Sequence, residues 1–205
     1  MKILTVCIGN AERLPGKSYK TGINKNPFRG GVLVDAEGLV GDAICNRKHH
    51  GGVDQAVYLE GSLTLDWWSE QLGHPLEPGT FGENLVVGGL DNRDVAVGDR
   101  FVASDIELEV TAARIPCATF AARMGDPQFV KRYTEAARPG VYCRVIRGGT
   151  VTAGESIELR SFSGARVMLP EMMATFGRRL STEERARYLA APIHYKLRRA
   201  LEEET

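Results

Sequence analysis

Frequent glycines divide the sequence into short apolar segments, and this spacing limits the folds open to the chain. Glycine supplies 23 of the 205 residues, about 11% against an ordinary share of ~7%, and it favours turns over helix interiors. Many short strands between such turns indicate a barrel or a sandwich, so we predict a mainly β fold. The predicted strands, rich in Val, Ile, Leu and Tyr, are 2–8, 31–34, 56–60, 83–87, 100–103, 106–112, 141–146 and 156–160.

Helical patterns interrupt the strands and then replace them. Two helices are predicted between strands, at 62–72 and 118–137. Beyond residue 160 the apolar residues take helical spacing, and three short helices are predicted. Pro170 marks the start of the first helix, and Ser181 with Glu184 forms a capping box at the start of the second, which Pro192 ends. The third is predicted from the apolar residues Ile193, Leu197, Ala200 and Leu201.

This change of pattern divides the chain into two predicted parts. Residues 1–162 form the β-barrel domain, and residues 163–205 form a C-terminal helical extension. Helices this short are marginal alone. We expect them to pack on each other, on the barrel or on a second subunit, which makes a homodimer a candidate assembly.

Composition excludes several classes of partner. The chain has 26 Lys and Arg against 26 Asp and Glu, a net charge of zero. A nucleic-acid binder or an anionic-membrane binder normally carries a basic excess, so neither partner is expected. No stretch approaches the ~18 apolar residues of a membrane span, and the start resembles a strand more than a signal peptide. With four scattered cysteines, a reducing cytoplasm is the expected location.

Two glycine-containing segments could bind a ligand. In 47–57, cationic residues including Lys48 and His50 lead into Gly51 and Gly52, a pattern that fits an anion cradle as well as a solvated basic loop. In 79–85, the polar residues Thr80, Glu83 and Asn84 stand at the start of an apolar strand. They could cap a turn or form a hydrogen-bonding rim for a polar heterocycle.

Cys117 is the candidate for reactive chemistry. Pro116 keeps the preceding residue extended, and Cys117 stands at a predicted helix start near Arg114. The helix start and the Arg114 cation both favour the thiolate form of Cys117, which is a nucleophile and a soft metal ligand. A lone cysteine can equally be buried and inert, which is the expectation for Cys7 and Cys143 in apolar strands. Cys45 stays ambiguous.

Taken together, these segments resemble the MOSC domain, the family named for the C-terminal domain of molybdenum cofactor sulfurase. The likeness is to small stand-alone bacterial members with a C-terminal three-helix extension. The matching stretches occur in the family's order and are 21–27, 38–42, 49–58, 79–85, 97–99, 114–117 and 140–145.

The resemblance implies a MOSC-type β-barrel that binds the molybdenum cofactor, a molybdopterin with a terminal phosphate. It implies that Cys117 is the thiolate ligand to molybdenum and a catalytic residue. Contacts to the phosphate and the pterin are implied for Thr21, Lys25, Lys48 and His50. Positions at the cofactor or substrate mouth are implied for Thr80, Asn84 and Arg114.

The resemblance further implies a molybdenum-dependent reductase of N-hydroxylated compounds, such as hydroxylaminopurines or amidoximes. His50 or a bound water would supply a proton. The chain lacks the extra four-cysteine segment of some larger relatives, so a separate electron-transfer reductase is expected. It also has Val53 and Gln55 where the subgroup usually has Pro and Lys, and Ala118 and Thr119 where Trp and Lys are frequent. Two cations are therefore missing near the site.

Two other classes of function stay open. The domain could carry the cofactor, or a persulfide on Cys117, without turnover. It could also be a cysteine hydrolase that uses Cys117 with His50 and either Asp54 or Asn84.

Overall fold

The structure, a computed structural model, describes residues 1–46 and 51–203. Its main element is an eight-stranded sheet in the order β11-β7-β8-β9-β5-β6-β1-β2. All neighbours in this sheet are antiparallel except β5 and β6. The strands are β1 (Lys2–Gly9), β2 (Lys25–Pro27), β5 (Val57–Gly61), β6 (Leu85–Gly88), β7 (Arg100–Val102), β8 (Glu107–Ala113), β9 (Val141–Arg147) and β11 (Glu158–Arg160).

Shorter elements surround this sheet. A second sheet has the order β10-β3-β4, built from β10 (Gly149–Val151), β3 (Val32–Asp35) and β4 (Gly38–Leu39). Two 3₁₀ turns are η1 (Val53–Gln55) and η2 (Asn92–Asp94). The α-helices are α1 (Ser62–Leu72), α2 (Ala118–Met124), α3 (Phe129–Ala136), α4 (Leu169–Ala174), α5 (Thr182–Ala190) and α6 (Tyr195–Glu203).

The prediction of a mainly β barrel needs correction. In the described chain, helices and strands take up comparable shares, and the large sheet keeps two open edges, β2 and β11. The segment just before β11 approaches β1, where Ile3 N donates to Glu155 O at 2.9 Å, Gly154 N to Ile3 O at 2.7 Å and Ile157 N to Met1 O at 3.1 Å. A parallel pair needs a crossover, which α1 supplies between β5 and β6. The fold is thus a sheet-rich mixture of strands and helices.

Individual elements follow the sequence pattern closely. Each of the eight predicted strands is present with small shifts at its ends, and α1 has the predicted bounds. The predicted helix 118–137 is wrong in one respect, because it is broken into α2 and α3. Gly125 takes a left-handed conformation (φ 65°) that ends α2, and Asp126 Oδ1 accepts from Gln128 N at 2.8 Å in the turn that follows.

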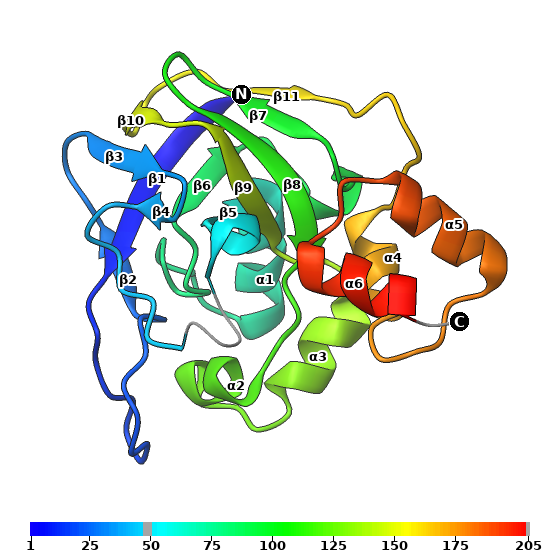
Figure 1. Ribbon diagram of the computed structural model, residues 1–205. Coiled ribbons are helices and arrows are strands. Elements are labelled where there is room, and N and C mark those ends of the chain that lie inside the picture. Colours follow the sequence, from blue (N-terminus) through cyan, green and yellow to red (C-terminus); the bar gives the residue numbers. More distant parts are fainter. Residues whose placement is uncertain (47–50, 204–205) are drawn as a thin grey trace.

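The three tail helices are present as predicted and lie together on one side of the sheet (Figure 1). The capping box is confirmed: Ser181 Oγ accepts from Glu184 N at 3.2 Å, and Ser181 N donates to Glu184 Oε2 at 2.8 Å. Leu169 is fully buried, and it joins Tyr188 and Leu201 in the hydrophobic core that contains the sheet residues. The division at residue 162 stays a prediction. No described helix has the length and hydropathy that a bilayer span requires.

Leu169→Ala should destabilise the whole chain, because the tail shares the core of the sheet. Loss of a fully buried leucine is expected to cost about 2–5 kcal/mol of unfolding free energy, measured by chemical denaturation. Phe176→Ala is the matched control, since Phe176 is 70% exposed and should change stability by no more than about 0.5 kcal/mol. Equal effects of the two variants would contradict this prediction.

Candidate functional site

One cavity brings together most of the predicted site residues. The described walls come from the loop around Tyr19–Lys25, the loop 42–46, the segment from Gly51 to Tyr58, and the start of α2. Of the predicted residues, the cavity is lined by Thr21, Lys25, Asn84, Arg114 and Cys117. Thr80 is not among the lining residues, while Lys48 and His50 lie outside the described residues.

Cys117 stands where the chain leaves β8 and begins α2. Its backbone is extended (φ −136°, ψ 171°), and its carbonyl accepts the first helical bond from Ala121 N at 3.0 Å. The predicted position at a helix start is therefore confirmed. The residue is half-buried and lines the cavity. Nearby, the hydroxyls of Tyr19 and Thr119 are hydrogen-bonded at 2.9 Å, which ties the 19–25 loop to α2.

Arg114 is a buried cation on the cavity wall. It is 5% exposed, and its guanidinium carbon lies 3.6 Å from the ring centroid of Phe120 and 5.5 Å from that of Tyr58. These rings stabilise the charge through cation–π contacts. Its Nη1 atom is buried and has no hydrogen-bond partner among the described residues. A buried unpaired donor is costly, so an acceptor brought within hydrogen-bond distance of this atom would be stabilising.

An aromatic cluster fixes the elements that carry Arg114 and Cys117. Trp68 of α1 stacks on Tyr133 of α3 with ring centroids 5.7 Å apart. Phe120 of α2 lies 5.0 Å from Phe129 of α3 and 5.2 Å from Phe81 of the 79–82 turn. All five rings are buried. The start of α2 is consequently held against two helices and a turn.

Asp42, another lining residue, connects three separate segments of the chain. Its carboxylate accepts from Gly9 N at 2.8 Å and from Asn84 Nδ2 at 2.9 Å, and it forms an ion pair with Lys25. Lys25 is buried, so the pair is shielded from water. The positive charge predicted for Lys25 is therefore balanced by Asp42, and Lys25 keeps donor positions beyond this one bond.

Asn84 has a structural role as well as a place on the wall. Its Oδ1 accepts from Tyr58 N at 3.1 Å, and its Nδ2 also donates to Cys7 O at 3.3 Å. These bonds, with the one to Asp42, occupy the amide and join β1 to β5. The amide is thus bonded within the protein, and the placement of Asn84 at the cofactor or substrate mouth stays a prediction.

In the 79–85 segment, the side chains of Glu83 and Thr80 cap the turn, which is one of the two interpretations of its sequence. Glu83 is fully buried, and its carboxylate accepts from Gly79 N at 2.5 Å and from Phe81 N at 3.0 Å. The hydroxyl of Thr80 donates to Glu77 O at 2.6 Å. Both side chains therefore stabilise the turn, and through Phe81 the turn supports the aromatic cluster.

Close packing of the backbone lets two loops share the wall. A Cβ added at Gly22 would lie 1.7 Å from the carbonyl oxygen of Ala43, far inside contact distance. Only glycine allows the 21–23 segment to run this close to residue 43. The loop that carries Thr21 and Lys25 and the loop that carries Asp42 are brought together in this way.

Glu60 is a buried acid near the cavity that the sequence pattern did not predict as part of the site. Glu60 is fully buried; Tyr58 Oη donates to its Oε1 at 2.5 Å and Asn92 Nδ2 donates to its Oε2 at 2.5 Å. Burial raises the pKa of Glu60 to about 8, although Tyr58 and Arg114 act in the opposite direction. Burial likewise raises the pKa of Glu83 to about 7. The one sequence signal for a buried acid was the presence of Glu60 in the otherwise apolar run 56–60.

The other three cysteines are two buried core residues and one exposed residue. Cys7 and Cys143 are fully buried, and burial raises the pKa of the Cys7 thiol to about 12. Both are core residues, as predicted. Cys45 is exposed and lines the same cavity as Cys117.

Among the described residues, the partners proposed for a cysteine hydrolase are not arranged around Cys117. Asp54 forms an ion pair with Arg144 and is absent from the described cavity wall, and the amide of Asn84 is already bonded to Tyr58, Asp42 and Cys7. Neither group is left to orient an imidazole toward Cys117.

The raised pKa of Glu60 predicts that stability falls as pH rises. Between about pH 4.5 and 8 the folded protein keeps a proton that the unfolded chain has lost. The free energy of unfolding should therefore decrease by up to roughly 1.4 kcal/mol per pH unit over this window. Glu60→Gln should reduce the dependence to the part that Glu83 supplies, while Glu135→Gln, at an exposed carboxylate, should leave it unchanged. A pH series of denaturation curves with equal slopes in wild type and Glu60→Gln would contradict the assignment.

Comparison with known proteins extends these observations. The family model "MOSC domain" matches residues 46–158. The chain is 34% identical to the protein YflK of Bacillus subtilis (strain 168) over 161 residues, which cover 78% of this chain and 73% of YflK. It is 31% identical over 148 residues to a protein of Gibberella moniliformis (strain M3125 / FGSC 7600) named "Reductase". That match covers 70% of this chain but only 26% of the fungal protein.

The fold has a close counterpart among solved structures. The crystal structure of YiiM from Geobacillus stearothermophilus superposes with a TM-score of 0.80 at 23% identity and covers 98% of this chain and 97% of that one. The structural likeness therefore includes the helical tail as well as the sheet. Since the family model spans more than half of the sequence and YflK is similar along most of its length, the chain belongs to the MOSC domain family.

Proposed function

We propose that the protein binds the molybdenum cofactor in the cavity around Cys117 and reduces N-hydroxylated compounds there. The observation that supports this most is the juxtaposition of Cys117 with the unpaired, buried Nη1 of Arg114 on one cavity wall. A thiolate suits a soft metal, and a guanidinium suits an anionic oxygen. MOSC domains are associated with this cofactor, so family membership and local chemistry agree.

The residues present fit such a group. Cys117 would bind molybdenum, and Arg114 Nη1 would donate to an anionic or carbonyl oxygen of the cofactor or substrate. Lys25 and Thr21, which also line the cavity, would bind the phosphate end, with Asp42 holding the Lys25 ammonium in place. Lys48 and His50 remain predicted contacts to the same end. A cavity that contains Lys25 and Arg114 can thus bind an anion although the whole chain has no net charge.

The bound cofactor would supply two electrons for cleaving the N–O bond of the substrate. The balanced reaction is R–NH–OH + 2e⁻ + 2H⁺ → R–NH₂ + H₂O. The protein's part is to hold the substrate beside Cys117, to exclude bulk water with the buried rings of Tyr58 and Phe81 on the cavity wall, and to deliver protons, for which His50 or a bound water is the proposed donor.

The electrons would come from a separate reductase. The fungal relative supports this part of the proposal, because it is named "Reductase" and the match to this chain covers only 26% of its length. The fungal protein contains further sequence beyond the matched part, and we propose that a partner protein supplies the electrons here.

Cys117→Ala should abolish molybdenum binding. Purified from a host that makes the cofactor, the wild type should contain stoichiometric molybdenum and pterin, and the variant should contain neither, by elemental analysis and pterin fluorescence. Cys45→Ala is the matched control, because Cys45 is a thiol on the same cavity and is given no ligand role. Stoichiometric molybdenum in Cys117→Ala would overturn the ligand assignment.

Arg114→Met should weaken cofactor retention and leave the ligand thiol in place. Loss of a charge-assisted hydrogen bond is expected to lower the affinity by about 10- to 100-fold, measured as the rate of pterin loss on gel filtration. Retention equal to wild type would refute a role for Nη1.

Turnover distinguishes the enzyme from the carrier. The loaded wild type should reduce a hydroxylaminopurine with an artificial electron donor, and protein from a host unable to make the cofactor should not. Retained molybdenum without turnover would favour the alternative of a cofactor carrier, and persulfide on Cys117 would favour a sulfur carrier. Ester cleavage by metal-free protein would revive the hydrolase.

A further inference from the structure

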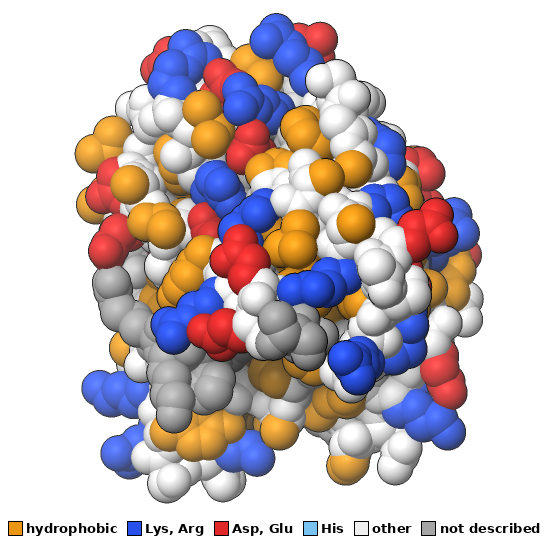
Figure 2. All heavy atoms as spheres, turned by 45° about the vertical axis from the view of Figure 1, so that its right-hand side comes forward, with side chains coloured by type: hydrophobic (Ala, Val, Ile, Leu, Met, Phe, Trp, Pro, Cys, Tyr) orange, Lys and Arg blue, Asp and Glu red, His pale blue; other side chains and the backbone are white. Residues whose placement is uncertain are grey.

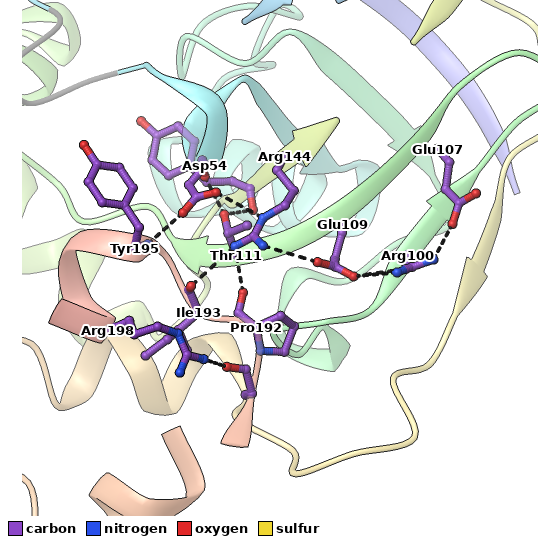
Figure 3. A network of polar contacts seen from close by, with 12 residues as sticks. Asp54, Arg100, Glu107, Glu109, Thr111, Arg144, Pro192, Ile193, Tyr195 and Arg198 are labelled. Atoms are coloured by element: carbon purple, nitrogen blue, oxygen red, sulfur yellow. Dashed lines mark hydrogen bonds and ion pairs between the residues drawn. The ribbon is translucent and has the colours of Figure 1, made fainter. Parts of the chain in front are cut away.

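Asp54 connects the helical tail to the wall of the cavity. It lies in the 3₁₀ turn η1, between the lining residues Gly51 and Gln55. Its side chain is buried, is not among those that line the cavity, and points toward the start of α6 (Figure 3). The residue therefore lies between the site and a part of the chain more than a hundred positions away.

Three elements bind Asp54 from different directions. Tyr195 N, at the start of α6, donates to Oδ2 at 2.7 Å. Arg144 Nε of β9 lies 3.1 Å from Oδ1 in an ion pair. Thr111 Oγ1 of β8 donates to the backbone carbonyl of Asp54 at 2.5 Å. A carboxylate at a helix N-terminus also interacts favourably with the helix dipole, so charge and geometry agree.

The tail is bound to the same network at the connection before α6. Arg144 Nη2 donates to Pro192 O at 3.0 Å, and Arg144 Nη1 lies 3.7 Å from Glu109 Oε1 (Figure 3). His194 N donates to Thr111 O at 3.0 Å. Residues 192–195 are thus held by two neighbouring strands as well as by Asp54.

We propose that the tail is a positioning element of the site, and that Asp54 transmits its effect to the cavity wall formed by Gly51, Gln55 and Ala56. Asp54 is a positioning residue, since it does not line the cavity. The proposal concerns the cavity of the proposed function, on which its relevance to cofactor binding rests. The packing of the tail onto the sheet would then determine how firmly this wall is held.

Tyr195→Pro tests the link with little disturbance of the helix. Proline lacks the N–H that donates to Asp54, yet it is favoured at the first position of a helix, which Tyr195 occupies. Tyr195→Ala is the matched control, because it removes the same half-exposed ring and keeps the N–H. Hydrogen–deuterium exchange of metal-free full-length protein should show amides 52–56 exchanging at least about tenfold faster in Tyr195→Pro than in Tyr195→Ala.

Thr111→Val provides an independent variant should Tyr195→Pro fold poorly. It keeps the shape of the side chain and removes the bond to the Asp54 carbonyl, so it should also accelerate exchange at 52–56. Equal exchange in Tyr195→Pro and Tyr195→Ala, or acceleration that is confined to α6, would overturn the proposal.

The loaded protein separates this proposal from the proposed function. Tyr195→Pro should release pterin faster than Tyr195→Ala, and equal release rates would refute the link to cofactor binding. If no variant and no wild-type preparation contains pterin, the proposed function fails, and the exchange result on metal-free protein still decides whether Asp54 couples the tail to the wall.

Discussion

A buried guanidinium is the constraint on which the arrangement of the site depends. Arg114 is almost fully removed from water, so its charge needs compensation within the protein. Phe120, Tyr58 and Tyr133 surround it with ring faces, and its charge acts on the buried carboxyls of Glu60 and Glu83. The aromatic cluster is therefore both the local core and the environment of the ion.

Two buried carboxyl groups, those of Glu60 and Glu83, lie near the cation Arg114. If both carboxyls were ionised, this buried group would carry an excess negative charge, and the raised pKa values of Glu60 and Glu83 show how the excess is relieved. Lys25 and Asp42, which line the same cavity as Arg114, form a neutral pair. Charge is balanced locally at the surface too, where acidic and basic side chains are mixed across the face shown in Figure 2.

The sequence predicted local structure well, because strands and caps leave local patterns. Short apolar segments between glycine-containing turns identified the eight strands, and Ser181 with Glu184 marked a helix start that the structure contains. The closed barrel was wrong because the closure of a sheet depends on pairing between distant strands. Three strands of two or three residues, among them β4 at Gly38–Leu39, were missed because such short elements carry too little pattern.

The site could be predicted only in part for a related reason. Segments matching the family identified Cys117 and Arg114, which do share a cavity wall. The bonds that occupy the Asn84 amide, the bond from Asn92 to Glu60 and the bond from Tyr195 to Asp54 join residues 26 to 141 positions apart. No local pattern encodes such pairs. Glu60 appeared only as a charge in an apolar strand, and Asp54 only as part of a glycine-rich loop.

The bonds between Asp54 and the start of α6 have a consequence for biosynthesis. During translation, the segment from Gly51 to Ala56 leaves the ribosome long before Tyr195, its partner through Asp54. The sheet can begin to pair while the wall still lacks that support. The finished wall thus arises only after residue 195 has emerged, so any ligand that needs the complete wall can bind only after the tail has been made.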